Sequence, residues 1–254
     1  MKKPYEGHEI VYRRMKKQGI LVWGQKGSGK QVKSCRGETN AFLKEVLSQP
    51  WAPKSGRVIE LGCGTGPMLR WVCKKGFSGL GVDISSTAIS MAKEQSKGLD
   101  IQFQRGDVCH LDARRLGKFD LAIDGLCLHC ITDAKDRKRY LDGVFKLLNK
   151  GGLFVLLTMC GPANKKKLHE ICRGHEMVKN IIYVPFESKG YGKLFVFNGK
   201  PCLPSRYIGH WKNILAEVSR AGFELKLIRY NAHNCSDFCG TLTVGALKST
   251  AASV

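Results

Sequence analysis

The stretch Arg57-Val-Ile-Glu-Leu-Gly-Cys-Gly-Thr-Gly66 joins a short apolar run to a loop with glycines at alternate positions. An apolar run of this length that ends at a glycine is typical of a buried strand. Gly62 and Gly64 have no Cβ, so the backbone can approach a ligand closely, and Gly66 can begin a helix without a clash. We therefore expect a strand, a ligand-binding loop and a helix, in that order.

The segment after the loop extends this pattern. Residues 68–75 have a helical pattern, and residues 78–83 form a second apolar run that ends at Asp83. A carboxylate at the end of this strand is placed to accept hydrogen bonds from two ribose hydroxyls. The dinucleotide pattern Gly-x-Gly-x-x-Gly is not met, because Pro67 stands where its third glycine would fall. This favours a ligand without a pyrophosphate.

The alternation of apolar runs and helical patterns continues to residue 160. Ser85-Ser86 is an N-cap signal for a helix, and Asn149-Lys-Gly-Gly152 predicts the turn that ends a later one. The expected strands are 57–61, 78–83, 101–104, 119–123 and 153–158, and the expected helices are 38–48, 68–75, 85–96 and 134–148. Short apolar strands separated by helices indicate an α/β fold with a parallel sheet covered on both faces.

The rhythm changes after residue 160. A basic segment at 164–179 precedes two strand-like runs, 181–184 and 194–197, and Ser188-Lys-Gly-Tyr-Gly192 between them predicts a hairpin turn. The remaining expected elements are a helix and two strands, at 206–221, 225–230 and 240–247. With no helix between them, these last two strands predict an antiparallel hairpin at one edge of the sheet.

Composition bounds the class of protein. The chain has 254 residues, 43% of them hydrophobic, which fits a globular domain with a sizeable core. It contains no run long enough to span a bilayer and no signal peptide at its N-terminus. Eleven scattered cysteines favour a reducing compartment. We therefore expect a cytoplasmic protein without a membrane partner; the oligomeric state stays open.

The positive charge is concentrated in two segments. The chain has 42 basic and 21 acidic residues, a formal net charge of +21. Residues 1–36 contain ten Lys or Arg and two Glu, and residues 164–200 contain eight and three. This distribution favours an acidic partner, either a nucleic acid or an anionic small molecule. A solvated basic surface that serves solubility is the alternative.

Four motifs give the chain a resemblance to the class I (Rossmann-like) S-adenosylmethionine-dependent methyltransferases, over roughly residues 38–160. Glu60-Leu-Gly-Cys-Gly-Thr-Gly66 matches the family's first motif, and Asp83 matches its ribose-binding acid. Ile84 stands where the family packs a side chain on the adenine face. The resemblance implies that Glu60, Gly62, Gly64, Gly66, Asp83 and Ile84 bind S-adenosyl-L-methionine.

Two later motifs belong to the same resemblance. Phe103-Gln-Arg-Gly-Asp-Val108 ends the third strand, and in the family its acid bonds the adenine amino group while the next backbone N–H reads a ring nitrogen. Asp107 and Val108 hold these positions here. Asp124 ends the fourth strand, beside the methionine moiety in similar proteins. The resemblance thus adds Asp107, Val108 and Asp124 to the expected cofactor site.

The resemblance implies a doubly wound, seven-stranded, mostly parallel sheet with a C-terminal antiparallel hairpin and a small lid insertion. We expect one methyltransferase domain in four parts: a basic N-terminal flap (1–37), a cofactor-binding core (38–160), a substrate-lid insertion (161–205), and the last helix and closing strands (206–254). Trp23 is the aromatic residue expected to close the flap over the cofactor.

Other motifs give weaker alternatives. Gly24-Gln-Lys-Gly-Ser-Gly-Lys-Gln31 nearly fits a phosphate-binding P-loop, but Gln31 lacks the hydroxyl that would bind Mg²⁺. Cys127-Leu-His-Cys130 resembles a metal pair, with His233, Cys235 and Cys239 as distant further ligands. His169-x-x-Cys172-x-x-His175 has ligand-like spacing in a basic, solvated stretch. We expect no metal and assign Cys127–Cys130 to the methionine and substrate pocket.

The acceptor is harder to predict, because methyl transfer mainly requires alignment and exclusion of water. Asp124-Gly-Leu-Cys127 lacks the motif that amino-methylating DNA and RNA enzymes usually carry after the fourth strand. The C5-cytosine methyltransferases need a Pro-Cys near the same strand, but the only Pro-Cys here, Pro201-Cys202, lies far downstream. His129 is a candidate general base, with a structural buried histidine as the alternative. Basic, aromatic-bearing segments on both sides of the cleft favour a small acceptor with a carboxylate or phosphate group. An RNA (tRNA) methyltransferase is the second hypothesis, and a non-catalytic cofactor-binding scaffold the third.

Overall fold

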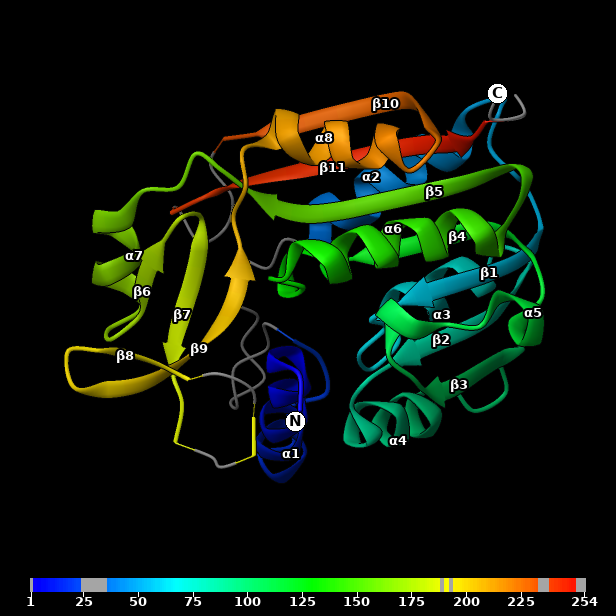
Figure 1. Ribbon diagram of the computed structural model, residues 1–254. Helices are drawn as coiled ribbons and strands as arrows, with labels where there is room; N and C mark the ends of the chain where they lie inside the picture. Colours follow the sequence, from blue (N-terminus) through cyan, green and yellow to red (C-terminus); the bar gives the residue numbers. More distant parts are fainter. Residues whose placement is uncertain (1, 24–35, 188–189, 192–193, 233–237, 250–254) are drawn as a thin grey trace.

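The computed structural model describes residues 2–23, 36–187, 190–191, 194–232 and 238–249. They form a seven-stranded sheet with helices on both faces and a separate four-stranded sheet beside it (Figure 1). Within these ranges, every helix is too short or too polar to cross a membrane. The predicted α/β fold class is confirmed.

The large sheet contains the five predicted core strands and the two closing strands. Its strands are β1 (Gly56–Leu61), β2 (Phe77–Asp83), β3 (Ile101–Arg105), β4 (Phe119–Gly125), β5 (Leu148–Cys160), β10 (Phe223–Asn231) and β11 (Gly240–Lys248). The accompanying helices are α2 (Arg36–Ser48), α3 (Pro67–Cys73), α4 (Ser86–Gln95), η2 (Val108–His110), α5 (Ala113–Leu116), η3 (Leu128–Cys130), α6 (Ala134–Leu147) and α8 (Trp211–Arg220).

The strand order is β10-β11-β5-β4-β1-β2-β3. The five core strands are parallel, and β11 is antiparallel to both β5 and β10, so the predicted C-terminal hairpin is confirmed. The chain runs outward from β1 through β2 to β3, and then returns to add β4 on the other side of β1. Ligands of such sheets bind outside the carboxyl ends of the strands at this switch point. The arrowheads of β1, β2 and β5 point toward the side where the second sheet lies (Figure 1).

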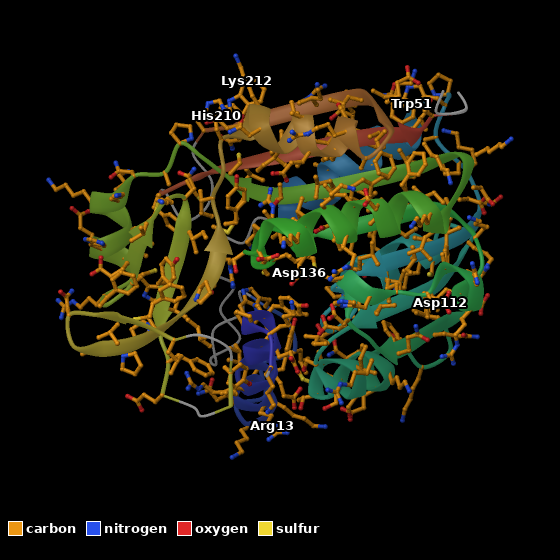
Figure 2. All side chains as sticks on the ribbon, in the orientation of Figure 1. Arg13, Trp51, Asp112, Asp136, His210 and Lys212 are labelled. Carbon is orange, nitrogen blue, oxygen red and sulfur yellow. The ribbon has the colours of Figure 1, made fainter. Side chains whose placement is uncertain are left out.

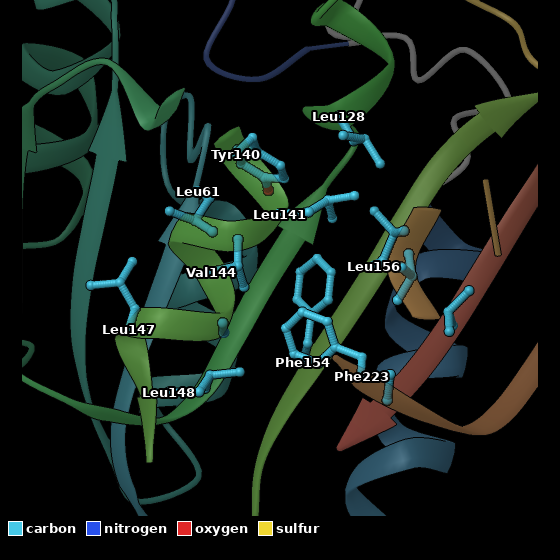
Figure 3. Close-up of a cluster of buried hydrophobic side chains, with 14 of the residues drawn as sticks. Leu61, Leu128, Tyr140, Leu141, Val144, Leu147, Leu148, Phe154, Leu156 and Phe223 are labelled. Atoms are coloured by element: carbon cyan, nitrogen blue, oxygen red, sulfur yellow. The ribbon is translucent and has the colours of Figure 1, made fainter. Parts of the chain in front are cut away.

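Two hydrophobic cores form on opposite faces of the large sheet. Phe154 and Leu156 of β5 pack with α6 and α8, while Leu153 and Val155 pack with α2, α3 and α4. Successive side chains of a strand point to opposite faces, so one strand serves both cores. Figure 3 shows Phe154 and Leu156 together with Leu141 of α6. This packing is why the strand is apolar from Leu153 to Leu157.

The second sheet differs from the sequence prediction. Its strands are β6 (Glu176–Val178), β7 (Ile181–Pro185), β8 (Phe195–Phe197) and β9 (Lys200–Tyr207), in the order β6-β7-β9-β8, preceded by α7 (Lys165–Ile171). The predicted hairpin between the runs 181–184 and 194–197 is wrong, because β9 lies between them and pairs with both. β9 could not be predicted as a strand because it contains Pro201 and Pro204, and proline has no N–H to donate to a neighbouring strand. A register shift opposite Ile182 and Tyr183 accommodates Pro204.

Two boundaries also differ. Residues 149–152 do not form a separate turn but belong to β5, between its paired positions Leu148 and Leu153. This irregularity includes Gly151, which has a φ of +69°. The last helix begins at Trp211 rather than at residue 206, because the chain from 206 to 207 is still part of β9.

The N-terminal segment contains two helices that the sequence did not indicate, η1 (Pro4–Gly7) and α1 (His8–Lys17). They lie between the second sheet and α4 (Figure 1). Tyr12 and Met15 of α1 are buried against Ala88 of α4. Trp23 is 47% exposed, and its ring packs edge-on against Tyr12, with centroids 5.7 Å apart. The P-loop-like segment 24–31 lies outside the described residues.

Candidate functional site

The glycine loop follows β1 at the switch point of the sheet. Gly62, Gly64 and Gly66 all have positive φ angles, of 69°, 53° and 73°. Side chains with a Cβ rarely adopt this conformation, so three alternate glycines are needed for the loop to turn back toward α3. A Cβ added at Gly64 would lie 2.5 Å from the hydroxyl oxygen of Tyr12. The loop is therefore in close contact with α1.

Two buried carboxylates hold this loop. Glu60 Oε2 accepts the backbone N–H of Leu69 at 3.0 Å. Asp83 Oδ2 accepts the N–H of Gly64 at 2.8 Å, and its Oδ1 accepts the N–H of Ser85 at 2.8 Å. Burial raises the pKa of Glu60 to about 8 and also raises the pKa of Asp83. Both acids are thus costly to ionise in the free protein, and a cation placed beside them would favour their charged forms.

The next two strand ends supply further predicted residues. Ile84 is partly exposed, and its carbonyl oxygen accepts a hydrogen bond from Arg105 Nε. Asp107 Oδ1 accepts the N–H of Cys109 at 2.9 Å, while Oδ2 lies 3.0 Å from the Tyr5 hydroxyl, which donates to it. His110 Nδ1 also lies 2.8 Å from Asp107 Oδ2. The third strand end is therefore in direct contact with the N-terminal segment.

Asp124 is fully buried near the end of β4, where it accepts hydrogen bonds from the segment that follows it and from α6. Its Oδ1 accepts the N–H of Cys127 at 2.6 Å, and its Oδ2 accepts the N–H of Leu128 at 2.9 Å and the hydroxyl of Tyr140 at 2.7 Å. Burial raises the pKa of Asp124 to about 7. These bonds fix η3 at the switch point.

η3 carries the predicted base. His129 is 4% exposed, its Nδ1 has no partner among the described residues, and its Nε2 lies 3.7 Å from Cys130 Sγ. Burial acts to raise the pKa of the Cys130 thiol, but the positive charge of Arg206 and the side chain of His129 hold it below its ordinary value. The structure therefore adds a cation, Arg206, to the neighbouring His129 and Cys130, which the sequence motif already contained.

The N-terminal segment is fastened to the loops around the switch point. Glu9 of α1 accepts hydrogen bonds from Ser85 Oγ at 2.6 Å and Thr87 Oγ1 at 2.7 Å, at the start of α4. Burial acts to raise the pKa of Glu9, but these hydrogen bonds lower it to about 2. Lys3 Nζ forms an ion pair of 2.6 Å with Asp136 of α6. The segment therefore covers the carboxyl ends of the core strands.

His8 lies at the junction of η1 and α1 with a defined tautomer. Its Nδ1 is 2.7 Å from the carbonyl oxygen of Tyr5, and a carbonyl only accepts, so Nδ1 carries the hydrogen. Burial lowers the pKa of His8 to about 4, and the charge of Arg206 acts in the same direction. The ring is therefore neutral near pH 7, and no group among residues 2–23, 36–187, 190–191, 194–232 and 238–249 donates a hydrogen bond to the lone pair of its Nε2.

The end of β9 contributes the remaining residues of the site. Arg206 is partly buried, and its Nη1 donates to the carbonyl and hydroxyl oxygens of Ser205 at 2.8 and 2.9 Å. The ring of Tyr207 faces the guanidinium of Arg137, with the guanidinium carbon 3.6 Å from the ring centroid. Arg137 also pairs with Glu217 of α8. The end of β9 is thus held against α6 and α8, two helices that cover the large sheet.

Sequence reasoning missed four residues of this arrangement: Tyr5, His8, Tyr12 and Arg206. The only signal for α1 was the apolar spacing of Tyr12 and Met15, which is short for a helix prediction. Arg206 fell at the start of a predicted helix, because the prolines of β9 obscured that strand. Among the described residues, no three His, Cys, Asp or Glu side chains could jointly hold a metal ion; His233 and Cys235 lie outside them.

Comparison with known proteins gives consistent matches. A family model described as a methyltransferase domain matches residues 58–152. The chain is 28% identical over 180 residues to a carboxy-S-adenosyl-L-methionine synthase of Campylobacter jejuni, which covers 68% of this chain and 71% of the relative. It is 31% identical over 128 residues to a ubiquinone biosynthesis O-methyltransferase of Psychrobacter cryohalolentis, covering 49% of this chain and 48% of the relative.

Solved structures show the same fold. An S-adenosylmethionine-dependent methyltransferase from Clostridium acetobutylicum superposes with a TM-score of 0.58 at 19% identity, covering 82% of this chain and 90% of the other. At this identity the likeness concerns the fold alone. The matched family region begins in β1 and ends in β5, so it contains the glycine loop and the ends of β2, β3 and β4, but not the end of β9.

Proposed function

This chain belongs to the class I S-adenosylmethionine-dependent methyltransferases, and on that premise we propose that it methylates a small acceptor with a carboxylate or phosphate group. The observation that carries the proposal is the cover over the carboxyl ends of the core strands. α1 and the end of β9 both lie there, and Tyr12 and His129 are only 8% and 4% exposed. Such an enclosed site suits a small acceptor better than a folded polymer.

The proposed cofactor-binding residues are those of the loop and strand ends: Glu60, Gly62, Gly64, Gly66, Asp83, Ile84, Asp107, Val108 and Asp124. The acids among them can accept further hydrogen bonds from the cofactor, because a carboxylate oxygen accepts two hydrogen bonds. Each oxygen of Asp83 uses one bond within the protein, which leaves one for each ribose hydroxyl. Asp107 Oδ1 likewise has one bond left for an adenine amino group. Asp124 would act mainly by fixing η3.

The domain organisation is part of the same proposal. Residues 38–160 would bind the cofactor, and the segments 1–37 and 161–205 would close over the acceptor from two sides. The second sheet continues to residue 207, so we include the end of β9 in the acceptor side. The last helix and the closing strands complete the large sheet.

Bound S-adenosylmethionine supplies a methyl group that is already activated for displacement. The chain must then orient the acceptor, exclude water and, for an O–H or N–H acceptor, receive a proton. We propose His129 for the proton, because its buried Nδ1 has no partner among the described residues. His8 is a second candidate, because its ring is neutral and its Nε2 accepts no hydrogen bond from the described residues.

The names of two relatives support a small acceptor. One is a synthase of carboxy-S-adenosyl-L-methionine, and the other is an O-methyltransferase of ubiquinone biosynthesis. Both names refer to small molecules rather than to polymers. They do not agree on an acceptor, so we propose only its class.

Tritium-labelled S-adenosylmethionine tests the proposal. The purified protein would be incubated with the labelled cofactor and either a metabolite extract or bulk RNA, with Asp83→Ala as the control. We expect label in anionic metabolites that bind an anion-exchange resin, and much less label with the variant when the cofactor is below saturation. Label that appears only in RNA, or no transfer to any fraction, would contradict the proposal.

RNA methylation is a second candidate, favoured by one surface feature. The rings of His210, Trp211 and Tyr230 form a stack, with successive centroids 5.8 and 5.2 Å apart, and Lys212 lies over Trp211. Figure 2 shows His210 and Lys212 at the start of α8. Stacked rings with adjacent cations bind unpaired bases in other proteins. If RNA is the acceptor, Trp211→Ala will weaken binding of a single-stranded oligonucleotide in a fluorescence anisotropy titration; unchanged affinity removes this candidate.

A further inference from the structure

Arg206, at the end of β9, is a shielded cation with part of its guanidinium unpaired. Its Nη1 is held by Ser205. Among the described residues, none accepts a hydrogen bond from Nε or Nη2, and no carboxylate forms an ion pair with this side chain. Neither nitrogen is fully buried, so the edge of the guanidinium that they form is accessible.

The other shielded arginines of the described chain are fully engaged. Arg70 donates to the carbonyl oxygen of Thr65, to Ser96 Oγ and to Gln95 Oε1. Arg137 pairs with Glu217 and stacks on Tyr207. Partial burial of a charge is unfavourable without a partner, so these two arginines follow the general rule. Arg206 departs from it.

The surroundings of Arg206 belong to the site rather than to the outer surface. Its charge acts on Cys130 of η3 and on His8 of the N-terminal segment. His8 in turn is influenced by Asp83, the proposed ribose ligand. β9 also contacts both η3 and η1, so three segments that are far apart in the sequence come together at its end, at the edge of the sheet where the cofactor is expected.

We propose that the Nε–Nη2 edge of Arg206 binds the oxyanion of the methyl acceptor, in a subsite that Cys130 and His8 help to form. This inference rests on the proposed function and adds the residue that selects the acceptor. Two parallel N–H groups match the two oxygens of a carboxylate or a phosphate, a geometry that lysine cannot provide. The bonds of Nη1 to Ser205 hold the guanidinium so that this edge stays free.

Cys130 serves as a built-in reporter of the subsite. Removal of the Arg206 charge raises the pKa of its thiol, and so does an anion bound to Arg206, because either change removes net positive charge beside the thiolate. The rate of alkylation by iodoacetamide against pH, read by mass spectrometry of the peptide that contains Cys130, measures this pKa without any methyl transfer.

The experiment compares the wild-type protein with Arg206→Gln, with acetate and inorganic phosphate as probes. We expect Arg206→Gln to raise the pKa of Cys130, and each probe to raise it in the wild-type protein only. The probe with the larger effect identifies the oxyanion as a carboxylate or a phosphate. Arg220→Gln, on the exposed side of α8, is the matched control and should behave as wild type. An unchanged Cys130 titration in Arg206→Gln, or an equal probe effect in both proteins, overturns the proposal.

A second measurement separates the acceptor from the cofactor's own carboxylate. Binding of S-adenosylhomocysteine should be the same in Arg206→Gln as in the wild-type protein, whereas the KM for an anionic acceptor should rise at least about tenfold. Arg206→Lys should recover only part of this loss. A tenfold weaker affinity for S-adenosylhomocysteine in Arg206→Gln would assign the arginine to the cofactor and overturn the subsite. Probe effects without any methyl transfer would overturn the proposed function alone.

Discussion

The carboxyl edge of the large sheet and the second sheet that faces it place their polar side chains differently. At the large sheet, Asp83 and Asp124 are held by backbone N–H groups of the loops that directly follow them. At the second sheet, Arg206 leaves one edge of its guanidinium without a partner among the described residues. The acids of the first region are held in place by local backbone bonds, whereas the second region presents an unpaired donor to the space between them.

This difference explains how one fold serves many acceptors. The cofactor is the same throughout the family, so its site can be preorganised by local bonds within the core strands. The acceptor varies, and the residues that we propose for its binding come from η1, α1, η3 and β9, which meet only in the folded protein.

The largest effect on stability is expected from a substitution in the core of the large sheet. Phe154 is fully buried between α6 and Phe223. Phe154→Ala should lower the free energy of unfolding by about 3–5 kcal/mol, because it creates a cavity in the core. Urea denaturation followed by circular dichroism measures the change, with Phe154→Leu as a milder control. A loss below about 1 kcal/mol would show that this core is less tightly packed than described.

The next effect concerns the cofactor. Asp83→Ala should weaken binding of S-adenosylhomocysteine by about 1–3 kcal/mol, because two ribose hydroxyls lose their acceptor. Isothermal titration calorimetry gives the affinity, and the melting temperature without ligand shows whether the loop still folds. Ser86→Ala, at the exposed first position of α4, is the control. Unchanged affinity in Asp83→Ala would mean that the cofactor site is misplaced.

A pH dependence follows from the buried acids of the large sheet. The pKa of Glu60 is raised to about 8 in the folded protein, so the folded state holds a proton that the unfolded chain has lost. The free energy of unfolding should therefore fall as the pH rises toward 8, and remain high below the ordinary glutamate value. Glu60→Gln should reduce this slope by up to roughly 1 kcal/mol per pH unit. An unaltered slope in the variant would assign the dependence to other groups.

The smallest effect is expected in the second sheet. Val196 of β8 is 70% exposed, so its side chain contributes little to packing. Val196→Ser should change the free energy of unfolding by no more than about 0.5 kcal/mol. The same denaturation measurement applies. A much larger loss would show that β8 is covered in solution, and that the contrast between the two sheets is overstated.

The same contrast governs what could be predicted from the sequence. The core strands were predicted because their apolar runs are local and their ends carry glycine or an acid, as in Glu60–Gly66 and Asp83. The order of the second sheet could not be predicted, because the prolines of β9 conceal the strand and its pairing depends on segments up to 26 residues apart, as for Ile181 and Tyr207. Tyr5, His8 and Arg206 join the site only through tertiary contacts. Their residue types carry no local signal.

The division of the site between a cofactor side and an acceptor side can be tested by one comparison. The affinity for S-adenosylhomocysteine would be measured by calorimetry in the wild-type protein, Asp83→Ala and Arg206→Gln. We predict a loss of about tenfold or more for Asp83→Ala and no change for Arg206→Gln. Equal losses in both variants, or a loss in Arg206→Gln alone, would contradict the account.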